Sequence, residues 1–286
     1  MASTLCIGGR EFAWGSRTFV MGVVNVTPDS FSGDGLLTGA AGGVDAAVEL
    51  ALRLEDEGAD IIDIGGESSR PRRVYPDARP VPEAEELRRV LPVIEGLAGR
   101  LAAPISIDTV KAAVAEAAVG AGAAMVNDVS MLTADAAMAA TVGRLGVPLV
   151  ISHTRERAVY RDVVAEVIAD LQAAVRVATD AGVSPDAVIL DPGIGFGKTP
   201  AQSLQMQRRL GELAALGHPL LIGASRKSSI GAVLGLPPHE RVEGTAATVA
   251  LAIERGADIV RVHDVRQMAR VARMSDAIVR GWQPPG

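Results

Sequence analysis

Three segments of the sequence repeat one pattern, and this repetition limits what the chain can fold into. Each has a Gly-Ala pair, a short apolar run, and then polar residues or glycines: GADIIDIGG (58–66), GAAMVNDV (122–129) and GADIVRVHD (256–264). The first glycine suits the left-handed position that ends a helix, and the apolar run suits a strand that is buried on both faces. We therefore expect each segment to be a junction where a helix leads into a strand.

Reading outward from these junctions gives eight short apolar strands. We expect them near residues 19–24, 60–64, 105–107, 124–127, 148–151, 188–190, 219–222 and 259–262. Amphipathic helices lie between them, with apolar residues at helical spacing in segments 44–52, 87–94 and 163–171. Eight strands alternating with helices predict an α/β fold, a (β/α)8 TIM barrel. An open doubly wound sheet is the alternative, but no Gly-rich dinucleotide fingerprint follows the first strand.

A hairpin is expected before the first barrel strand. Residues 5–12, with Gly8-Gly9 at their centre, predict a short N-terminal β-hairpin that caps the barrel bottom. No linker, low-complexity tract or run of like charges separates a second domain. We therefore expect residues 1–286 to form a single TIM-barrel domain.

Charge and composition argue against several kinds of partner. The 28 Lys and Arg residues against 34 Asp and Glu give a net charge of −6, and aromatic residues make up only 3%, so nucleic-acid binding is not expected. Cys6 is the single cysteine, which fits a reducing compartment. No apolar stretch reaches membrane-spanning length, and the first residues lack the pattern of a signal peptide. We expect a cytoplasmic protein that does not bind membranes.

Polar residues follow every predicted strand. They are Asn25, then Asp63 with Glu67 and Arg70, Asp108, Asn127 with Asp128, His153, Asp191, Ser225 with Arg226 and Lys227, and Arg261 with His263. One such residue would often be only a helix N-cap. Because the carboxyl ends of all eight strands meet at one face of a TIM barrel, polar residues at all eight tips indicate a site there.

The polar residues divide into two chemistries. Asp108, Asn127 and Asp191 are hydrogen-bond acceptors that suit a ligand edge with several N–H donors, such as an aminopyrimidinone ring. Arg70, Lys227, Arg261 and His263 suit phosphate, and GASRKSSIG (223–231) brings cations to a strand-to-helix turn. The Gly-rich stretch DPGIGFGK (191–198) lacks the spacing of a nucleotide P-loop. Its glycines fit a backbone that approaches a flat ring.

With these residues assembled, the chain resembles the dihydropteroate synthase family of the folate pathway. The resemblance is carried, in order along residues 21–265, by MGVVNVTPDSFS, DIGGESSRP, SIDT, VNDVS, DPGIGFGK, GASRKSSIG and VRVHDV. It implies a pterin-binding TIM barrel that condenses p-aminobenzoate with 6-hydroxymethyl-7,8-dihydropterin pyrophosphate, assisted by Mg²⁺, and that is a target of sulfonamides. It also implies a homodimer formed through barrel helices, for which segments 249–253 and 265–278 are candidates.

The resemblance also implies roles for individual residues. Lys227, Arg261, His263 and Asn25 would be catalytic, and Asn25 would reach the Mg²⁺ ion. Asp108, Asn127, Asp191, Phe196 and Lys227 would bind the pterin. Contacts to p-aminobenzoate and pyrophosphate would come from Thr27, Phe31, Ser69, Arg70, Pro71, Ser228, Arg261 and His263. The loop NVTPDSFSGDG (25–35) would be a lid that carries Phe31 over the substrates.

The sequence departs from the family pattern in three places, and two alternatives to the synthase activity stay open. The loop at 68–86 is long, Ser152 stands where the family tends to have Met with a shortened loop after His153, and Met131-Leu132 replaces a pair of small residues. The shortened loop keeps one alternative open, a catalytically silent paralogue that still binds pterin. The other is a methyltetrahydrofolate-dependent methyltransferase of the same superfamily, which would not need Lys227-Ser228, Arg261 and His263 together.

Overall fold

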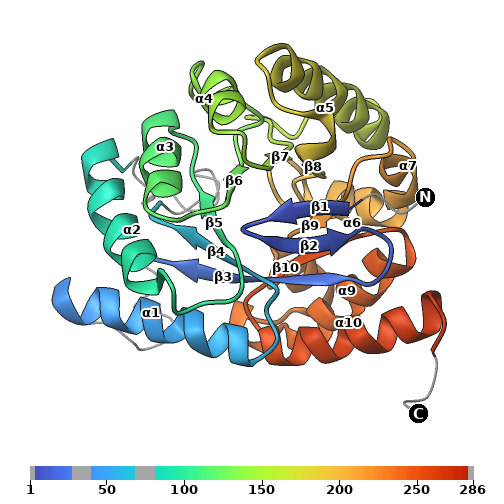
Figure 1. The fold of residues 1–286 in the computed structure, drawn as a ribbon. Helices are drawn as coiled ribbons and strands as arrows, with labels where there is room; N and C mark the ends of the chain where they lie inside the picture. The colour runs from blue at the N-terminus through green and yellow to red at the C-terminus, as the bar shows by residue number, and fades with distance from the viewer. Residues whose placement is uncertain (1–3, 28–39, 68–80, 283–286) are drawn as a thin grey trace.

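Eight parallel strands close into a barrel, as predicted. The computed structural model describes residues 4–27, 40–67 and 81–282. The barrel strands are β3 (Phe19–Asn25), β4 (Ile61–Gly65), β5 (Ile105–Asp108), β6 (Met125–Asp128), β7 (Leu149–Ser152), β8 (Val188–Asp191), β9 (Leu221–Ile222) and β10 (Ile259–Val262). Each pairs in parallel with its neighbours, β10 joins β9 to β3, and a bridge between Leu190 and Leu220 joins β8 to β9. The barrel fold is confirmed (Figure 1).

One strand is shorter than predicted. We expected residues 219–222, whereas β9 consists of Leu221–Ile222. Pro219 has no N–H to donate to a ladder, although its carbonyl still accepts from the N–H of Leu190 at 2.9 Å. The closure of the barrel between β8 and β9 is therefore made by few contacts.

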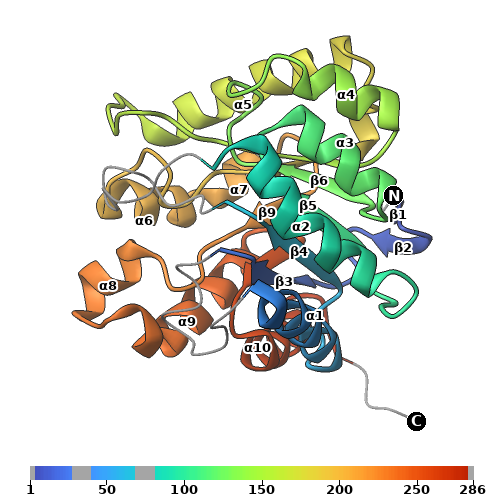
Figure 2. The same cartoon turned by 90° about the vertical axis from the view of Figure 1, so that its left-hand side faces the viewer.

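Helices form a layer around the barrel strands (Figure 1 and Figure 2). They are α1 (Ala40–Asp56), α2 (Glu83–Leu97), α3 (Ala112–Gly120), α4 (Met138–Leu145), α5 (Val163–Asp180), α6 (Pro200–Arg208), α7 (Leu210–Ala214), α8 (Ser228–Leu234), α9 (Val242–Glu254) and α10 (Val265–Val279). The Asp162 side chain caps α5, and Thr199 with Gln202 forms a capping box at α6. Within the described ranges, no helix is long and apolar enough to cross a membrane.

The N-terminal hairpin caps the bottom of the barrel, as expected. Strands β1 (Thr4–Ile7) and β2 (Arg10–Ala13) are joined by Gly8 and Gly9, whose φ angles are +55° and +82°. Both values belong to the left-handed region that a two-residue hairpin turn requires. A side chain at Gly8 would also be obstructed, because its Cβ would lie 2.9 Å from the Cβ of Pro104, the residue before β5.

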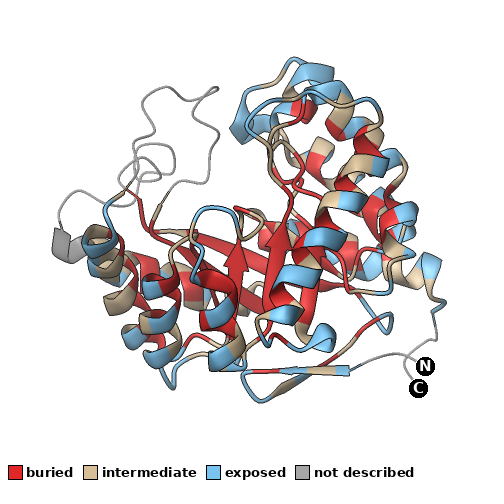
Figure 3. Ribbon diagram, turned by 90° about the horizontal axis from the view of Figure 1, so that it is seen from above, coloured by how far each residue is buried: buried red, intermediate tan, exposed pale blue. Residues whose placement is uncertain are grey.

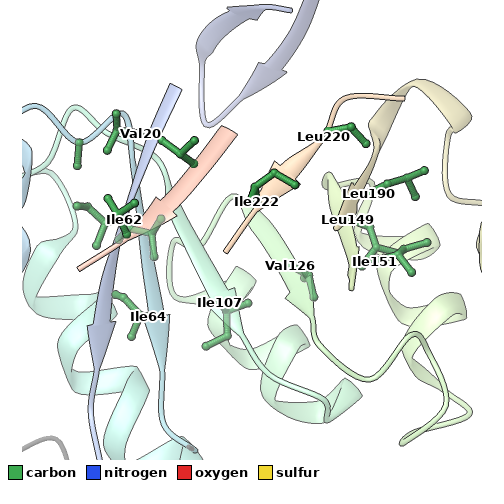
Figure 4. Packing of buried hydrophobic residues seen from close by; sticks show 14 of the residues in the cluster. Val20, Ile62, Ile64, Ile107, Val126, Leu149, Ile151, Leu190, Leu220 and Ile222 are labelled. Atoms are coloured by element: carbon green, nitrogen blue, oxygen red, sulfur yellow. The ribbon is translucent and has the colours of Figure 1, made fainter. Parts of the chain in front are cut away.

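The barrel strands are buried on both faces, while the outer faces of the helices are exposed (Figure 3). Outward-facing residues such as Ile62, Ile107 and Ile151 pack against the helices in one large core (Figure 4). A second, smaller core fills the lower barrel interior and includes residues of the hairpin. It contains Ile7, Phe12, Trp14, Phe19, Met21, Ile61, Met125, Val150, Ile189, Leu221 and Ile259. We call this second cluster the barrel floor.

Candidate active site

A polar layer lies directly above the barrel floor. In five strands, the residue two positions after a floor residue is polar: Asp63 follows Ile61, Asn127 follows Met125, Ser152 follows Val150, Asp191 follows Ile189, and Arg261 follows Ile259. Because side chains alternate along a strand, each of these residues points to the same side as the floor residue, into the barrel. They lie nearer the carboxyl ends of the strands, where TIM barrels carry their sites.

Arg261 connects two carboxylates in this layer. Its Nε donates to Asp63 Oδ2 at 2.6 Å, and its Nη2 donates to Asp108 Oδ2 at 2.7 Å. Asn127 Nδ2 donates to the same Asp63 oxygen at 3.2 Å. Asp63 Oδ1 and Asn127 Oδ1 are buried and make no hydrogen bond, so both can accept from a ligand. The structure thus brings the predicted residues Arg261, Asp108 and Asn127 together.

Burial and charge act against each other in this cluster. Burial raises the pKa of Asp108 to about 7, with Arg261 opposing the shift and Asp63 adding to it. Burial acts to lower the pKa of Arg261, but the carboxylates of Asp63 and Asp108 raise it above its ordinary value. Arg261 therefore keeps its charge, and its contact limits the rise in the pKa of Asp108.

Asp191 is held from two sides. Ser152 Oγ donates to Asp191 Oδ2 at 2.7 Å, and the N–H of Gly193 donates to Asp191 Oδ1 at 2.7 Å. Burial raises the pKa of Asp191, and these two hydrogen bonds counteract part of that rise. The carboxylate is therefore fixed in orientation by its neighbours on β7 and the following loop.

Lys227 and Phe196 form a pair beside Asp191. Lys227 Nζ lies 4.2 Å from the centre of the Phe196 ring, within the range of a cation–π contact. A Cβ at Gly195, whose φ is +84°, would lie 3.3 Å from Lys227 Cδ, so glycine leaves room for the lysine stem. Two residues predicted from different loops are thus in contact.

The turn that follows β9 is tied to the turn that follows β10. Ser225 Oγ lies 3.0 Å from His263 Nδ1, and Arg226, with a φ of +56°, forms a two-bond ion pair with Asp264. Burial lowers the pKa of His263 to about 3, and nearby Arg261 adds to the effect. His263 is therefore neutral at pH 7, and it would meet a phosphate oxygen as a hydrogen-bond donor. Ser228 is exposed at the start of α8.

The remaining predicted residues lie on the first two strand-to-helix connections. Asn25 ends β3 and is paired in register with Gly65 of β4, and Thr27 is buried two positions later. Phe31, Ser69, Arg70 and Pro71 lie outside the described residues, as do most of the expected lid and of the long second loop.

Sequence reasoning missed three residues that shape the site. The sequence indicates Asp63 only as a strand-tip residue, Ser152 only as a departure from the family pattern, and Lys198 only as the end of a Gly-rich loop. The two-residue step from the apolar floor would have identified Asp63 and Ser152 as inward-facing. No pattern in the sequence reveals Lys198, because its partners come from another loop.

A cavity of about 680 Å³ lies elsewhere, between the end of α1 and α10, and its lining includes Asp60, Arg270, Arg273 and Trp282. None of the polar layer lines it. Arg270 and Arg273 are exposed. This cavity lacks the residues of the polar layer. We therefore place the candidate site at the barrel mouth, where the polar groups converge.

Known proteins resemble this chain along nearly its whole length. The family described as pterin binding enzyme matches residues 21–263. The dihydropteroate synthase of Bacillus subtilis (strain 168) is 49% identical over 263 residues, which cover 92% of this chain and 89% of that protein. The solved structure of Xanthomonas albilineans dihydropteroate synthase with 4-aminobenzoic acid is 45% identical with a TM-score of 0.89, covering 97% of this chain and 98% of that one. The same enzyme in complex with 7,8-dihydropteroate is 44% identical with a TM-score of 0.86, covering 96% and 98%. The chain therefore belongs to the pterin-binding enzymes and, among them, to the dihydropteroate synthase family.

Proposed function

We propose that this chain condenses p-aminobenzoate with 6-hydroxymethyl-7,8-dihydropterin pyrophosphate, giving 7,8-dihydropteroate and pyrophosphate in folate biosynthesis. The observation that carries the proposal is the pairing of Arg261 with Asp108 at the barrel mouth, 2.7 Å apart. This contact joins one acceptor to one cation. The proposed substrate carries the complement of both, since its pterin edge offers N–H donors and its diphosphate is an anion.

Substrate binding would exchange one set of partners for another. The pterin edge would donate to Asp108, Asn127 and Asp191, and the diphosphate would accept from Arg261. Separating a buried ion pair is costly unless both members find new partners. A ligand with a donor edge and an anionic tail gives Asp108 and Arg261 a new partner each. A pterin without diphosphate gives a partner to Asp108 alone, so Arg261 would compete with the pterin for the Asp108 carboxylate. The site would thus favour the activated substrate.

Lys227 and Phe196 would form the wall of the pterin slot. The aromatic ring offers a flat apolar surface, and the ammonium 4.2 Å from its centre would reach the carbonyl side of the pterin. Asp191, fixed by Ser152 and Gly193, would face the donor edge. The three groups would set the plane of the ring before reaction.

The chemistry requires charge stabilisation more than a nucleophile of the protein's own. The C–O bond to the diphosphate breaks with both electrons leaving on the diphosphate, the amine nitrogen of p-aminobenzoate forms the new C–N bond, and the amine loses a proton. Arg261 and Lys227 would stabilise the negative charge that develops on the leaving group, and neutral His263 would donate a hydrogen bond to it. Thr27, Phe31, Ser69, Arg70, Pro71 and Ser228 would surround p-aminobenzoate and exclude water.

Mg²⁺ fits the donors that are present. Within the described part of the chain, no group of three His, Cys, Asp or Glu side chains could hold a metal ion by itself. Mg²⁺ commonly takes one or two protein oxygens and completes its shell with substrate phosphates and water. Asn25, at the end of β3, would supply an amide oxygen. When bound, the ion would add positive charge at the leaving diphosphate.

We also propose that the chain is a single domain that forms a homodimer in the cytoplasm. In the candidate segments, Val249 and Ile253 belong to the core, whereas Leu251, Met274 and Ile278 are at least half exposed. These exposed side chains on α9 and α10, which pack on each other, would form the interface. A Leu251→Glu variant should sediment as a monomer if they do.

A product assay with a matched pair of variants tests the proposed activity. Purified protein is incubated with both substrates and Mg²⁺, and 7,8-dihydropteroate is followed by mass spectrometry. Lys227→Ala should lower turnover by about 100- to 1,000-fold, the effect of losing one preorganised charge contact. Arg144→Ala, which removes one member of an exposed ion pair with Glu116, should leave turnover unchanged. Binding of the pterin pyrophosphate without any product would instead identify a silent paralogue.

A further inference from the structure

A second polar cluster lies behind the pterin wall and takes no part in the reaction proposed above. Lys198 Nζ donates to the carbonyl oxygens of Gly193 at 3.1 Å and Phe196 at 3.2 Å, and it lies 2.9 Å from His153 Nδ1. Lys198 and His153 are both buried. Three acceptors therefore match the three N–H groups of one ammonium.

The contacts of His153 on its two sides fix its tautomer. The Asp170 carboxylate accepts at Nε2, so the proton of the neutral ring resides on Nε2, and Nδ1 is left to accept from Lys198. Nε2 lies 3.1 Å from Asp170 Oδ2, which is also held by Arg155 at 2.7 Å. A continuous chain of hydrogen bonds thus runs from α5, through Asp170 and His153, to Lys198.

The loop that Lys198 holds is also fitted closely to its neighbour. A Cβ at Gly193, with a φ of +65°, would lie 1.8 Å from the carbonyl oxygen of His153, and one at Gly197, with a φ of +57°, would lie 2.1 Å from that of Arg155. Tyr160 Oη donates to the carbonyl of Gly197 at 3.0 Å. The backbone at 193–197 can approach residues 153–155 this closely only because both positions are glycine.

The same loop carries two groups of the site. Its Gly193 N–H holds Asp191, and its Phe196 ring contacts Lys227. We propose that Lys198 is a positioning residue, which acts with His153 and Asp170 to hold loop 192–197 so that Phe196 and Asp191 face the pterin. On this proposal, which rests on the proposed function, the short segment after His153 serves as the support for the pterin wall.

The proposal predicts a selective loss of pterin binding. Lys198→Met removes the three donors and keeps an unbranched side chain. It should raise the KM for the pterin pyrophosphate, and the calorimetric Kd for 7,8-dihydropteroate, at least tenfold. The KM for p-aminobenzoate and kcat should each change less than threefold. Arg144→Met, on the exposed surface of α4, is the control and should leave all four values unchanged.

Two His153 variants separate positioning from folding. His153→Asn keeps an acceptor near the place of Nδ1 and should stay within threefold of the wild type in pterin affinity. His153→Leu removes it and should match Lys198→Met. Equal affinities in the two His153 variants, or pterin affinity of the wild-type level in a folded Lys198→Met, would overturn the proposal. If Lys198→Met does not fold, the His153 pair decides.

The outcome for Lys198 can be told apart from the outcome for the proposed function. A wild-type protein that binds pterin but forms no product refutes the function, while the binding comparison still tests Lys198. A wild-type protein that forms product, with a Lys198→Met variant that binds pterin equally well, refutes only the role of Lys198. A wild-type protein that binds no pterin refutes both.

Discussion

The lower and upper halves of the barrel interior are built by the same strands but hold opposite kinds of side chain. Below, Ile61, Met125 and Ile259 meet the hairpin in a wholly apolar floor. Two residues further along the same strands, Asp63, Asn127 and Arg261 form a hydrogen-bonded layer. The strand geometry does not change between them, so the difference is one of side-chain chemistry alone.

This comparison explains how one barrel can be both stable and reactive. The floor removes apolar surface from water and needs no partner outside the chain. The upper layer buries charges and leaves the oxygens Asp63 Oδ1 and Asn127 Oδ1 without hydrogen bonds, which costs stability. A substrate can repay that cost, so the layer is suited to binding. Substitutions in the floor should therefore change mainly stability, and substitutions in the upper layer should also change substrate binding.

The largest effect is expected in the floor. Phe12 is 1% exposed and lies with its ring centre 4.7 Å from that of Phe19. Phe12→Ala should lower the free energy of unfolding by about 3–5 kcal/mol, the range for deleting a buried aromatic side chain. Denaturant unfolding measures it, with Trp282→Ala, at a 67% exposed residue, as the control. At a temperature where the variant is folded, KM for both substrates should equal that of the wild type, and a changed KM would show that the halves are not independent.

A substitution at Arg261 should affect stability and activity together, because this residue serves both. Arg261→Met would leave Asp63 and Asp108 buried without their counter-charge, and we expect a loss of about 3 kcal/mol in stability. Turnover should fall at least about 100-fold, the effect of removing one charge contact to the leaving group. Unfolding curves and steady-state kinetics are measured on the same preparations.

A second substitution tests the electrostatic origin of that loss. Adding Asp63→Asn to Arg261→Met removes one of the uncompensated carboxylates. The double variant should regain part of the stability and none of the activity. Recovery of both, or of neither, would contradict the assigned role of the ion pairs.

The two buried histidines of the upper half should lower the stability of the fold in acid, and Asp108, whose pKa is raised, should oppose part of this loss. Burial lowers the pKa of His153 to about 4 and of His263 to about 3, from an ordinary value of 6.5. Below pH 6.5 the unfolded chain takes up these protons and the folded chain does not, so the stability from each neutral ring is complete above pH 6.5 and is lost as the pH falls. Each histidine contributes a slope of up to about 1.4 kcal/mol per pH unit.

Denaturant unfolding at pH 7, 6 and 5 measures this slope. The free energy of unfolding should fall less steeply in His153→Asn than in the wild type, because one of the two titrating rings is gone. His239→Asn, at an exposed histidine, is the control and should keep the wild-type slope. Equal slopes in all three proteins would mean that folding does not lower the pKa of His153.

The sequence allowed the strands and many of the site residues to be predicted, because both depend on local patterns. An apolar run that is buried on both faces gives a strand, and the polar residue that ends it lies at the mouth. The pairings could not be predicted, since they depend on closure of the barrel. Arg261 meets Asp63 across 198 positions of sequence only because β10 lies beside β3 and β3 beside β4. The support of Lys198 from His153 likewise joins two loops that no periodicity relates.

Ser152 gives the smallest and most specific comparison. Its hydroxyl holds Asp191 Oδ2 at 2.7 Å, whereas Ser106, on β5, is equally buried and makes no hydrogen bond through Oγ. Ser152→Ala should let the Asp191 carboxylate rotate and should raise its pKa further, because one of the hydrogen bonds that favour the charged form is lost. We expect 7,8-dihydropteroate to bind about tenfold more weakly, or about 1.4 kcal/mol.

Ser106→Ala is the matched control and should bind 7,8-dihydropteroate as the wild type does. The two substitutions remove the same hydroxyl group from two buried positions in the same barrel, and calorimetry measures the binding of 7,8-dihydropteroate to each variant. The comparison therefore cancels the general cost of losing a buried oxygen and leaves only the contact with Asp191. Equal losses in both variants would mean that the polarity of the interior, and not the orientation of Asp191, determines pterin affinity. A loss confined to Ser152→Ala would show that serine at this position is part of how the chain holds its acceptor.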